Sequence, residues 1–106
     1  MKINGMPVVN ATKPLNLTIT KSDVTLGANK DPAACAAARS ACRLPQVDEA
    51  RIHLGRAYIR VGKKWTRYET GRSLRTEIIA FDRGGTFEPG EYQLGAVRES
   101  HRFGRQ

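Results

Sequence analysis

The sequence predicts a small α+β domain with an antiparallel sheet and two helices on one face, in the ferredoxin-like order βαββαβ, preceded by an N-terminal β-ribbon. Its 106 residues are enough for one hydrophobic core and too few for two. Hydrophobic residues make up 40% of the chain, so such a core can form. Segments with strand-like alternation are interrupted by two segments with helical spacing. We therefore expect an N-terminal arm at residues 1–13, a single domain at 14–97 and a basic C-terminal tail at 98–106.

The N-terminal part of the chain predicts a hairpin, a strand and a short helical turn. Asn4-Gly5 is typical of a type I′ turn, because both central residues of that turn need a positive φ, and it predicts a β-ribbon at residues 2–8. Residues 15–20 alternate apolar and polar side chains and predict the first core strand. Residues 22–27 predict one helical turn that ends at a glycine.

The first longer helix is predicted over residues 32–43. Asp31 is a suitable N-cap, and Pro32 suits the first turn, where its missing N–H costs nothing. Cys35 and Cys42 share the face of this alanine-rich helix that should pack on the sheet. Their α-carbons would be about 10 Å apart on a helix, whereas a disulfide needs them within about 7 Å. We expect two buried cysteines that are not bonded to each other. We expect no zinc site, because the pair has no nearby histidine or second cysteine pair.

Residues 50–61 predict one long strand, although its apolar positions change parity. They are even-numbered before Gly55 and odd-numbered after it. A bulge near Gly55 would restore one continuous buried face. A tight turn at residues 62–63 then leads into a second strand at 64–69, which completes an antiparallel hairpin.

The second helix is predicted to begin at Ser73. Leu74, Ile78 and Phe81 fall on one face by their spacing, and Gly84 can adopt the left-handed conformation that ends a helix. These three side chains should anchor the helix to the sheet.

The last predicted strand is residues 92–97. The segment 88–91 has proline and glycine at its two central positions, a pattern typical of a type II turn, and it leads into this strand. The remaining residues, 98–106, show no periodicity and form the basic tail.

Nothing in the sequence indicates a reaction. A catalytic nucleophile needs a nearby histidine that a third group orients. His53 lies on a strand of ambiguous parity, His101 lies in the irregular tail, and the acidic residues are scattered. We expect no enzymatic activity, cofactor, metal or small-molecule substrate. No stretch approaches the roughly 20 apolar residues that span a bilayer, and the first residues lack the apolar run of a secretion signal, so we expect synthesis in a cytoplasm and no membrane partner.

Positive charge is the most informative property of the composition. Eighteen Lys and Arg residues against 10 Asp and Glu residues give a net charge of +8 and a pI near 10.1, which favours an acidic partner. If Ala57, Ile59 and Val61 point inward, an Arg-Tyr-Arg ladder occupies the opposite face of that strand. On the neighbouring strand, Trp65 and Arg67 share one side and Lys64, Thr66 and Tyr68 share the other. Whichever side faces outward adds an aromatic residue and a cation to this surface. The candidate binding residues are Arg56, Tyr58, Arg60, Trp65 and Arg67.

Two interpretations of this basic surface are open. Aromatic side chains between cations hold single-stranded nucleic acid on the surface of a sheet. Alternatively, Trp65 and Tyr68 are partly buried hairpin residues, and the arginines only solvate an open sheet face.

Two segments carry a resemblance to known proteins. Residues 30–38 (KDPAACAAA) and residues 78–92 (IIAFDRGGTFEPGEY) are similar to segments of small uncharacterised proteins encoded by tailed bacteriophages of proteobacteria. The resemblance extends over about residues 15–94. It implies a phage origin and brings no catalytic residues with it.

The leading prediction is a non-enzymatic structural protein of a phage particle, such as a decoration or accessory subunit of the head or tail. It would be made in the host cytoplasm, reside in the virion and contact other phage structural proteins through its arm and tail. The candidate assembly contacts in the tail are Arg98, His101, Arg102, Phe103 and Arg105. The alternative is a small basic phage protein that binds nucleic acid or an acidic host partner through the basic sheet face.

Overall fold

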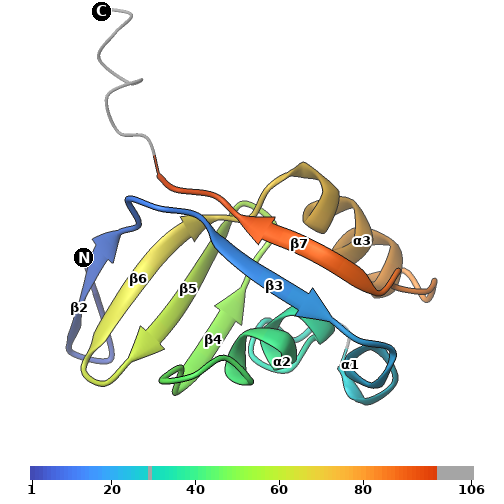
Figure 1. Ribbon diagram of the computed structural model, residues 1–106, viewed down its shortest axis with the longest axis horizontal. Helices are drawn as coiled ribbons and strands as arrows, with labels where there is room; N and C mark the ends of the chain where they lie inside the picture. The colour runs from blue at the N-terminus through green and yellow to red at the C-terminus, as the bar shows by residue number, and fades with distance from the viewer. Residues whose placement is uncertain (29, 98–106) are drawn as a thin grey trace, which may run out of the picture.

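The computed structural model describes residues 1–28 and 30–97 of the chain. It is a mixed α+β structure, as the sequence predicts, with three helices and seven strands in the described part (Figure 1). The strands are β1 (Lys2–Ile3), β2 (Met6–Asn10), β3 (Leu15–Ile19), β4 (Glu49–Ile52), β5 (Arg56–Val61), β6 (Lys64–Glu69) and β7 (Gly90–Leu94). The helices are α1 (Lys21–Leu26), α2 (Ala36–Cys42) and α3 (Arg72–Asp82).

The strands form two sheets. The larger has five strands in the order β1-β2-β6-β5-β4, and only β2 and β6 are parallel in it. The smaller is the antiparallel pair β3-β7, which crosses in front of the larger sheet in Figure 1. Helix α2 contacts β3 and β4, whereas α3 lies along β7. None of the helices in the described residues is both long and apolar enough to cross a membrane.

The ferredoxin-like order is not present. That order would place the first and last core strands in the same sheet as the central hairpin, with both helices on one face. Instead, β3 and β7 pair with each other and form a second layer. Leu17, Ile19 and Leu94 on this pair are fully buried in the core. Burial of these side chains between two layers accounts for the separate sheet.

The N-terminal hairpin is confirmed. Asn4 and Gly5 have φ values of 53° and 81°, as a type I′ turn requires, and Ile3 pairs with Met6 across the turn. Strand β2 then pairs with β6 from Val8 onward, so the ribbon is the edge of the five-stranded sheet.

The start of α2 differs from the prediction. The side chain of Asp31 accepts a hydrogen bond from the Ala33 N–H (3.0 Å) in a turn before the helix. The N-cap is instead Cys35, whose Sγ accepts a hydrogen bond from the Ala38 N–H (3.5 Å). The helix therefore begins at Ala36, because the cysteine takes the capping role predicted for the aspartate.

The two cysteines are free, as predicted, but only one is buried. Cys35 is 5% exposed, whereas Cys42 is exposed to solvent. The buried face of α2 is centred on Ala37 and Ala41, one helical turn apart. Cys42 is rotated off this face at the end of the helix, so its predicted burial is wrong.

The single bulged strand predicted at residues 50–61 is also wrong. The chain forms two strands, β4 and β5, joined by a turn in which the His53 N–H donates to the Arg56 carbonyl oxygen (2.9 Å). Ile52 lies directly opposite Ala57, and both point into the core. Because the chain reverses direction between β4 and β5, the even-numbered Ile52 and the odd-numbered Ala57 point to the same side of the sheet. The predicted burial of Val61 is also wrong, because this last residue of β5 lies next to the hairpin turn and is 44% exposed.

Helix α3 packs largely as predicted. Leu74 and Ile78 are buried, and Phe81 is half-buried with its ring edge against Phe87. The type II turn predicted at residues 88–91 is absent, because Gly90 is already the first residue of β7 and pairs with Ile19.

The core lies between the five-stranded sheet and the layer formed by β3, β7 and α2. Its larger side chains are aliphatic residues from both layers, and four alanines of α2 allow close approach. The main members are Leu17, Ile19, Ala37, Ala41, Ile52, Ile59, Leu74, Ile78, Phe87 and Leu94.

Candidate functional site

The five candidate binding residues of the sheet project from one face. Tyr58 lies directly opposite Arg67, and Arg60 lies directly opposite Trp65, across the β5-β6 hairpin. Directly paired residues of antiparallel strands point to the same side of a sheet, and Arg56 shares the parity of Tyr58. The intervening Ala57 and Ile59 point into the core. The hairpin therefore brings the predicted residues together on the side of the sheet that faces away from the core.

Arg51 joins this surface and was missed by the sequence analysis. It lies on β4 directly opposite Tyr58, so its side chain is on the same face. A signal was present, because Arg51 stands between Ala50 and Ile52, two apolar residues that both point inward. We call the surface formed by Arg51, Arg56, Tyr58, Arg60, Trp65 and Arg67 the arginine face.

Trp65 is fully buried within the arginine face, although it is on the side away from the main core. The guanidinium of Arg51 lies 5.1 Å from the centre of the indole ring, a cation–π contact. The indole N–H has no hydrogen-bond partner among the described residues. In this arrangement Trp65 supports the arginine above it and is not open for stacking with a ligand.

Carboxylates alternate with the cations across the arginine face. Glu49 pairs with both Arg51 (3.1 Å) and Arg60 (3.2 Å). Glu69 pairs with Arg56 (3.5 Å) at the other end of the hairpin. Each of these arginines remains at least one-quarter exposed, so their guanidinium groups are oriented but still accessible. The arginine face therefore carries positive and negative charges side by side.

Arg67 and Tyr58 occupy the middle of the face. The Nε of Arg67 donates to the side-chain oxygen of Asn10 on β2 (2.8 Å), which fixes the guanidinium without neutralising it. The half-buried ring of Tyr58 lies edge-on to His53, with 6.0 Å between the ring centroids. Tyr58 is therefore the aromatic residue of the face that a ligand can still reach.

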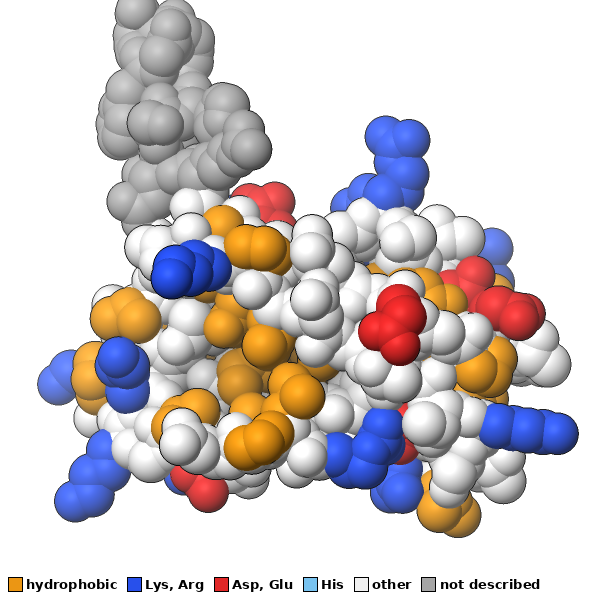
Figure 2. Space-filling model, viewed as in Figure 1, with side chains coloured by type: hydrophobic (Ala, Val, Ile, Leu, Met, Phe, Trp, Pro, Cys, Tyr) orange, Lys and Arg blue, Asp and Glu red, His pale blue; other side chains and the backbone are white. Residues whose placement is uncertain are grey.

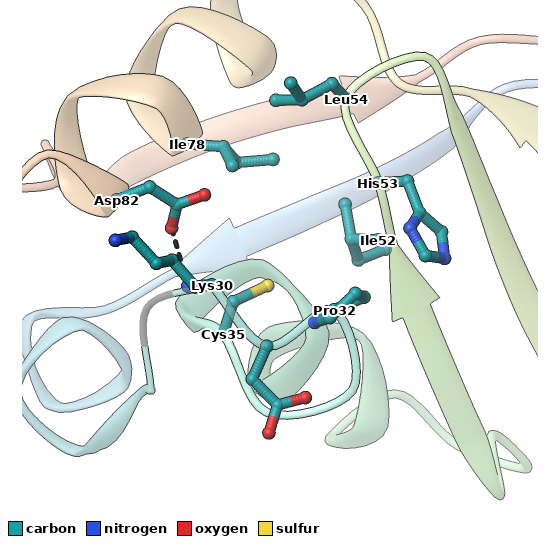
Figure 3. Close-up of a pocket in the computed structure, with 9 residues that line it drawn as sticks. Lys30, Pro32, Cys35, Ile52, His53, Leu54, Ile78 and Asp82 are labelled. Carbon is teal, nitrogen blue, oxygen red and sulfur yellow. Dashed lines mark hydrogen bonds between the residues drawn. The ribbon is translucent and has the colours of Figure 1, made fainter.

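A separate cavity of about 150 Å³ lies between α3, the end of β4 and the turn before α2 (Figure 3). The sulfur of Cys35 points into it, whereas the His53 ring is turned away. Burial raises the pKa of the Cys35 thiol. Asp82 accepts a hydrogen bond from the Lys30 N–H (2.7 Å) at its rim. A protonated thiol without an oriented base does not form a nucleophilic pair.

The other predicted contacts cannot be placed in the structure. Arg98, His101, Arg102, Phe103 and Arg105 lie outside the described residues.

Comparison with protein families, with curated proteins and with solved structures yields no match to this chain. The resemblance to phage proteins therefore remains a prediction. The fold and the site define a small α+β protein whose main sheet carries an arginine-rich outer face.

Proposed function

We propose that this protein is a non-enzymatic structural or accessory subunit of a phage particle, attached to an acidic neighbouring protein through its arginine face. The supporting observation is the convergence of four arginines around Tyr58 and Trp65 on the outer side of one sheet. The phage origin rests on the resemblance of residues 30–38 and 78–92 to proteins of tailed bacteriophages. The protein would be made in the host cytoplasm and incorporated into the virion as a head or tail decoration subunit.

The carboxylates of the arginine face favour a protein partner over nucleic acid. A phosphate backbone drawn to Arg51 or Arg60 would also approach Glu49, and one drawn to Arg56 would approach Glu69. Such like-charge proximity weakens binding to a polyanion. A protein surface can instead present both signs in a complementary pattern, which gives specificity.

Nucleic-acid binding is the second candidate function. The accessible Tyr58 lies opposite Arg67 and between Arg56 and Arg60 in its own strand, an arrangement that suits stacking of a single base. Trp65 contributes nothing to stacking while it is buried.

Mass spectrometry of purified virions of the encoding phage tests the proposal. The chain should be present at a defined copy number, and the double substitution Arg56→Ala with Arg67→Ala should lower that number. The matched control is Arg72→Ala with Arg75→Ala, two exposed arginines of α3. Absence of the chain from purified particles would reject the proposal, as would equal losses in the two double variants. Deletion of residues 98–106 measures the predicted contribution of the tail separately.

A salt titration of nucleic-acid binding tests the second candidate. If the arginine face binds nucleic acid, log K should fall linearly with log salt, and the Arg56→Ala, Arg67→Ala double variant should lower the slope by about 1–2. No binding of single- or double-stranded nucleic acid at about 50 mM salt would reject this function and leave an acidic protein as the partner.

A further inference from the structure

A second surface lies on the opposite side of β6 from the arginine face. It is a groove of about 260 Å³ between β2, β6 and the connection from β2 to β3. Successive residues of a strand point to opposite faces, so β6 directs Trp65 and Arg67 outward and directs Lys64, Thr66 and Tyr68 into this groove. The groove therefore lies on the other face of the sheet, and Asn10, one of its lining residues, accepts a hydrogen bond from Arg67 of the arginine face.

The groove carries cations without carboxylates. Lys13 and Lys64 line it, and none of its lining residues is acidic. No ion pair joins either lysine to another described residue. Thr66 and Tyr68, whose side chains carry hydroxyl groups, also line the groove. This contrasts with the arginine face, where acidic partners already hold most of the cations.

Apolar side chains lie beside these lysines. Val9 lines the groove and is 42% exposed. Val61 lies directly opposite Lys64, so it is on the same face, and it is 44% exposed. Figure 2 shows hydrophobic side chains in a hollow over the larger sheet, with Lys and Arg side chains around its rim. The surface thus combines positive charge with apolar contact area.

We propose that this groove binds an extended acidic segment of a partner protein. Its carboxylates would pair with Lys13 and Lys64, and its apolar side chains would pack against Val9 and Val61. The segment Lys64 to Tyr68 spans about 13 Å at about 3.3 Å per residue, so four or five extended residues of the partner fill the groove.

The charge of the groove selects this occupant over two others. A second copy of the chain carries a net charge of +8 and is repelled. The chain's own residues 98–106 are basic as well, with three arginines against one glutamate. Nucleic acid fits less well, because the exposed apolar side chains are valines, and the one aromatic residue of the lining, Tyr68, packs against the core.

An NMR titration with synthetic peptides tests the inference. The probe is a peptide of about ten residues built from Glu-Glu-Val-Val repeats, which presents glutamate and valine on each face of an extended chain and is long enough to span the groove. Its two controls replace all glutamates by lysine or all valines by serine. Amide shifts at Val9, Lys64 and Thr66 are expected with the glutamate–valine peptide. The lysine control should produce none, and the serine control should bind more weakly.

Charge-reversal variants locate the binding site. Lys13→Glu with Lys64→Glu should lower the affinity for the peptide by at least about tenfold, because two attractive surface ion pairs become repulsive. The matched control, Lys21→Glu with Lys30→Glu, reverses two exposed lysines elsewhere and should retain most of the affinity.

Two further variants keep the test interpretable. Val9→Ser leaves the charge unchanged and should also lower the affinity for the peptide. The inference therefore does not depend on a single variant remaining folded. Arg51→Glu with Arg56→Glu alters the arginine face at two residues whose ion pairs involve no lining residue of the groove, so the groove shifts should stay in place. This variant separates the inference from the proposed function. Equal affinity of the groove and control double variants would overturn the inference, as would equal binding of the lysine control or no shift at the groove.

Discussion

Asp23 provides the sharpest test of how the fold is held together. Its side chain is 1% exposed. The carboxylate accepts a hydrogen bond from the Thr20 N–H (2.9 Å), while the Thr20 hydroxyl accepts one from the Asp23 N–H (3.2 Å). The guanidinium of Arg43 donates to the same carboxylate and to the Thr18 carbonyl oxygen (2.8 Å). Asp23 therefore joins α1, the end of α2 and β3.

The substitution Asp23→Ala removes two kinds of interaction. Loss of the capping hydrogen bond costs about 1 kcal/mol. A hydrogen bond to a charged group contributes about 1.5–3 kcal/mol, and we take the low end because the Arg43 side chain is 47% exposed and its charge is screened. The expected loss in the free energy of unfolding is about 2–3 kcal/mol. Asp23→Asn keeps an acceptor for Thr20 and should lose about half as much.

The effect should depend on pH. Burial raises the pKa of Asp23, but the Thr20 N–H and the Arg43 guanidinium lower it by more, so the pKa lies below its usual value. A carboxyl group with a lowered pKa in the folded state stabilises fully above its unfolded pKa of about 3.9 and loses this contribution as the pH falls through the folded pKa. The difference between the parent and Asp23→Asn should therefore shrink in acid.

Urea denaturation followed by tryptophan fluorescence measures this effect. Trp65 is the single tryptophan and is fully buried, so its emission reports unfolding. The control is Asp31→Ala, which removes an exposed carboxylate with one local hydrogen bond and should cost less than about 1 kcal/mol. The reasoning would be refuted if Asp23→Ala unfolded within about 0.5 kcal/mol of the parent at neutral pH.

Three further predictions concern burial at single positions. In the native protein, Cys42 should react quickly with a thiol reagent and Cys35 only on unfolding, because the first is exposed and the second is buried; equal rates would contradict the placement of α2. Leu74→Ala should lower the free energy of unfolding by about 2–5 kcal/mol in a urea titration, since the side chain is 1% exposed; a change under about 1 kcal/mol would show that the core face of α3 is misplaced. Arg51→Ala should increase acrylamide quenching of Trp65 and cost about 0.5–1 kcal/mol, because the guanidinium covers the ring; unchanged quenching would mean that other groups bury the indole.

Local features of the fold could be predicted because their causes lie within a few residues. Asn4-Gly5 forms its turn because these two residues tolerate a positive φ wherever the hairpin is placed. Leu74 and Ile78 point inward because their helical spacing puts them on one face. The alternation of β5 likewise predicted that Arg56 and its neighbours face away from the core.

The arrangement of these elements was decided by contacts between distant segments. Nothing near Leu17 indicates that β3 pairs with β7 in a separate layer, because that pairing depends on burial against a sheet formed later in the chain. The parity change around Gly55 fitted a bulge and a hairpin equally well by sequence. The N-cap of α2 was likewise undecided by sequence, because the side chains of Asp31 and Cys35 can both accept a hydrogen bond from a backbone N–H. In the structure the cap is Cys35.

The candidate site shows the same division. The sequence by itself determined which residues within β5, and which within β6, share a side, because the side-chain period of a strand is two. The register of the hairpin then placed Trp65 and Arg67 on the side of Tyr58. Only the tertiary structure decided that β4 pairs with β5, which brings the outward-pointing Arg51 beside Tyr58, and that Trp65 is covered. Burial of an outward-facing indole depends on which strands lie beside it. The pairing of strands depends in turn on how much apolar area the whole chain can bury and on which register keeps the hydrophobic side chains on the core face.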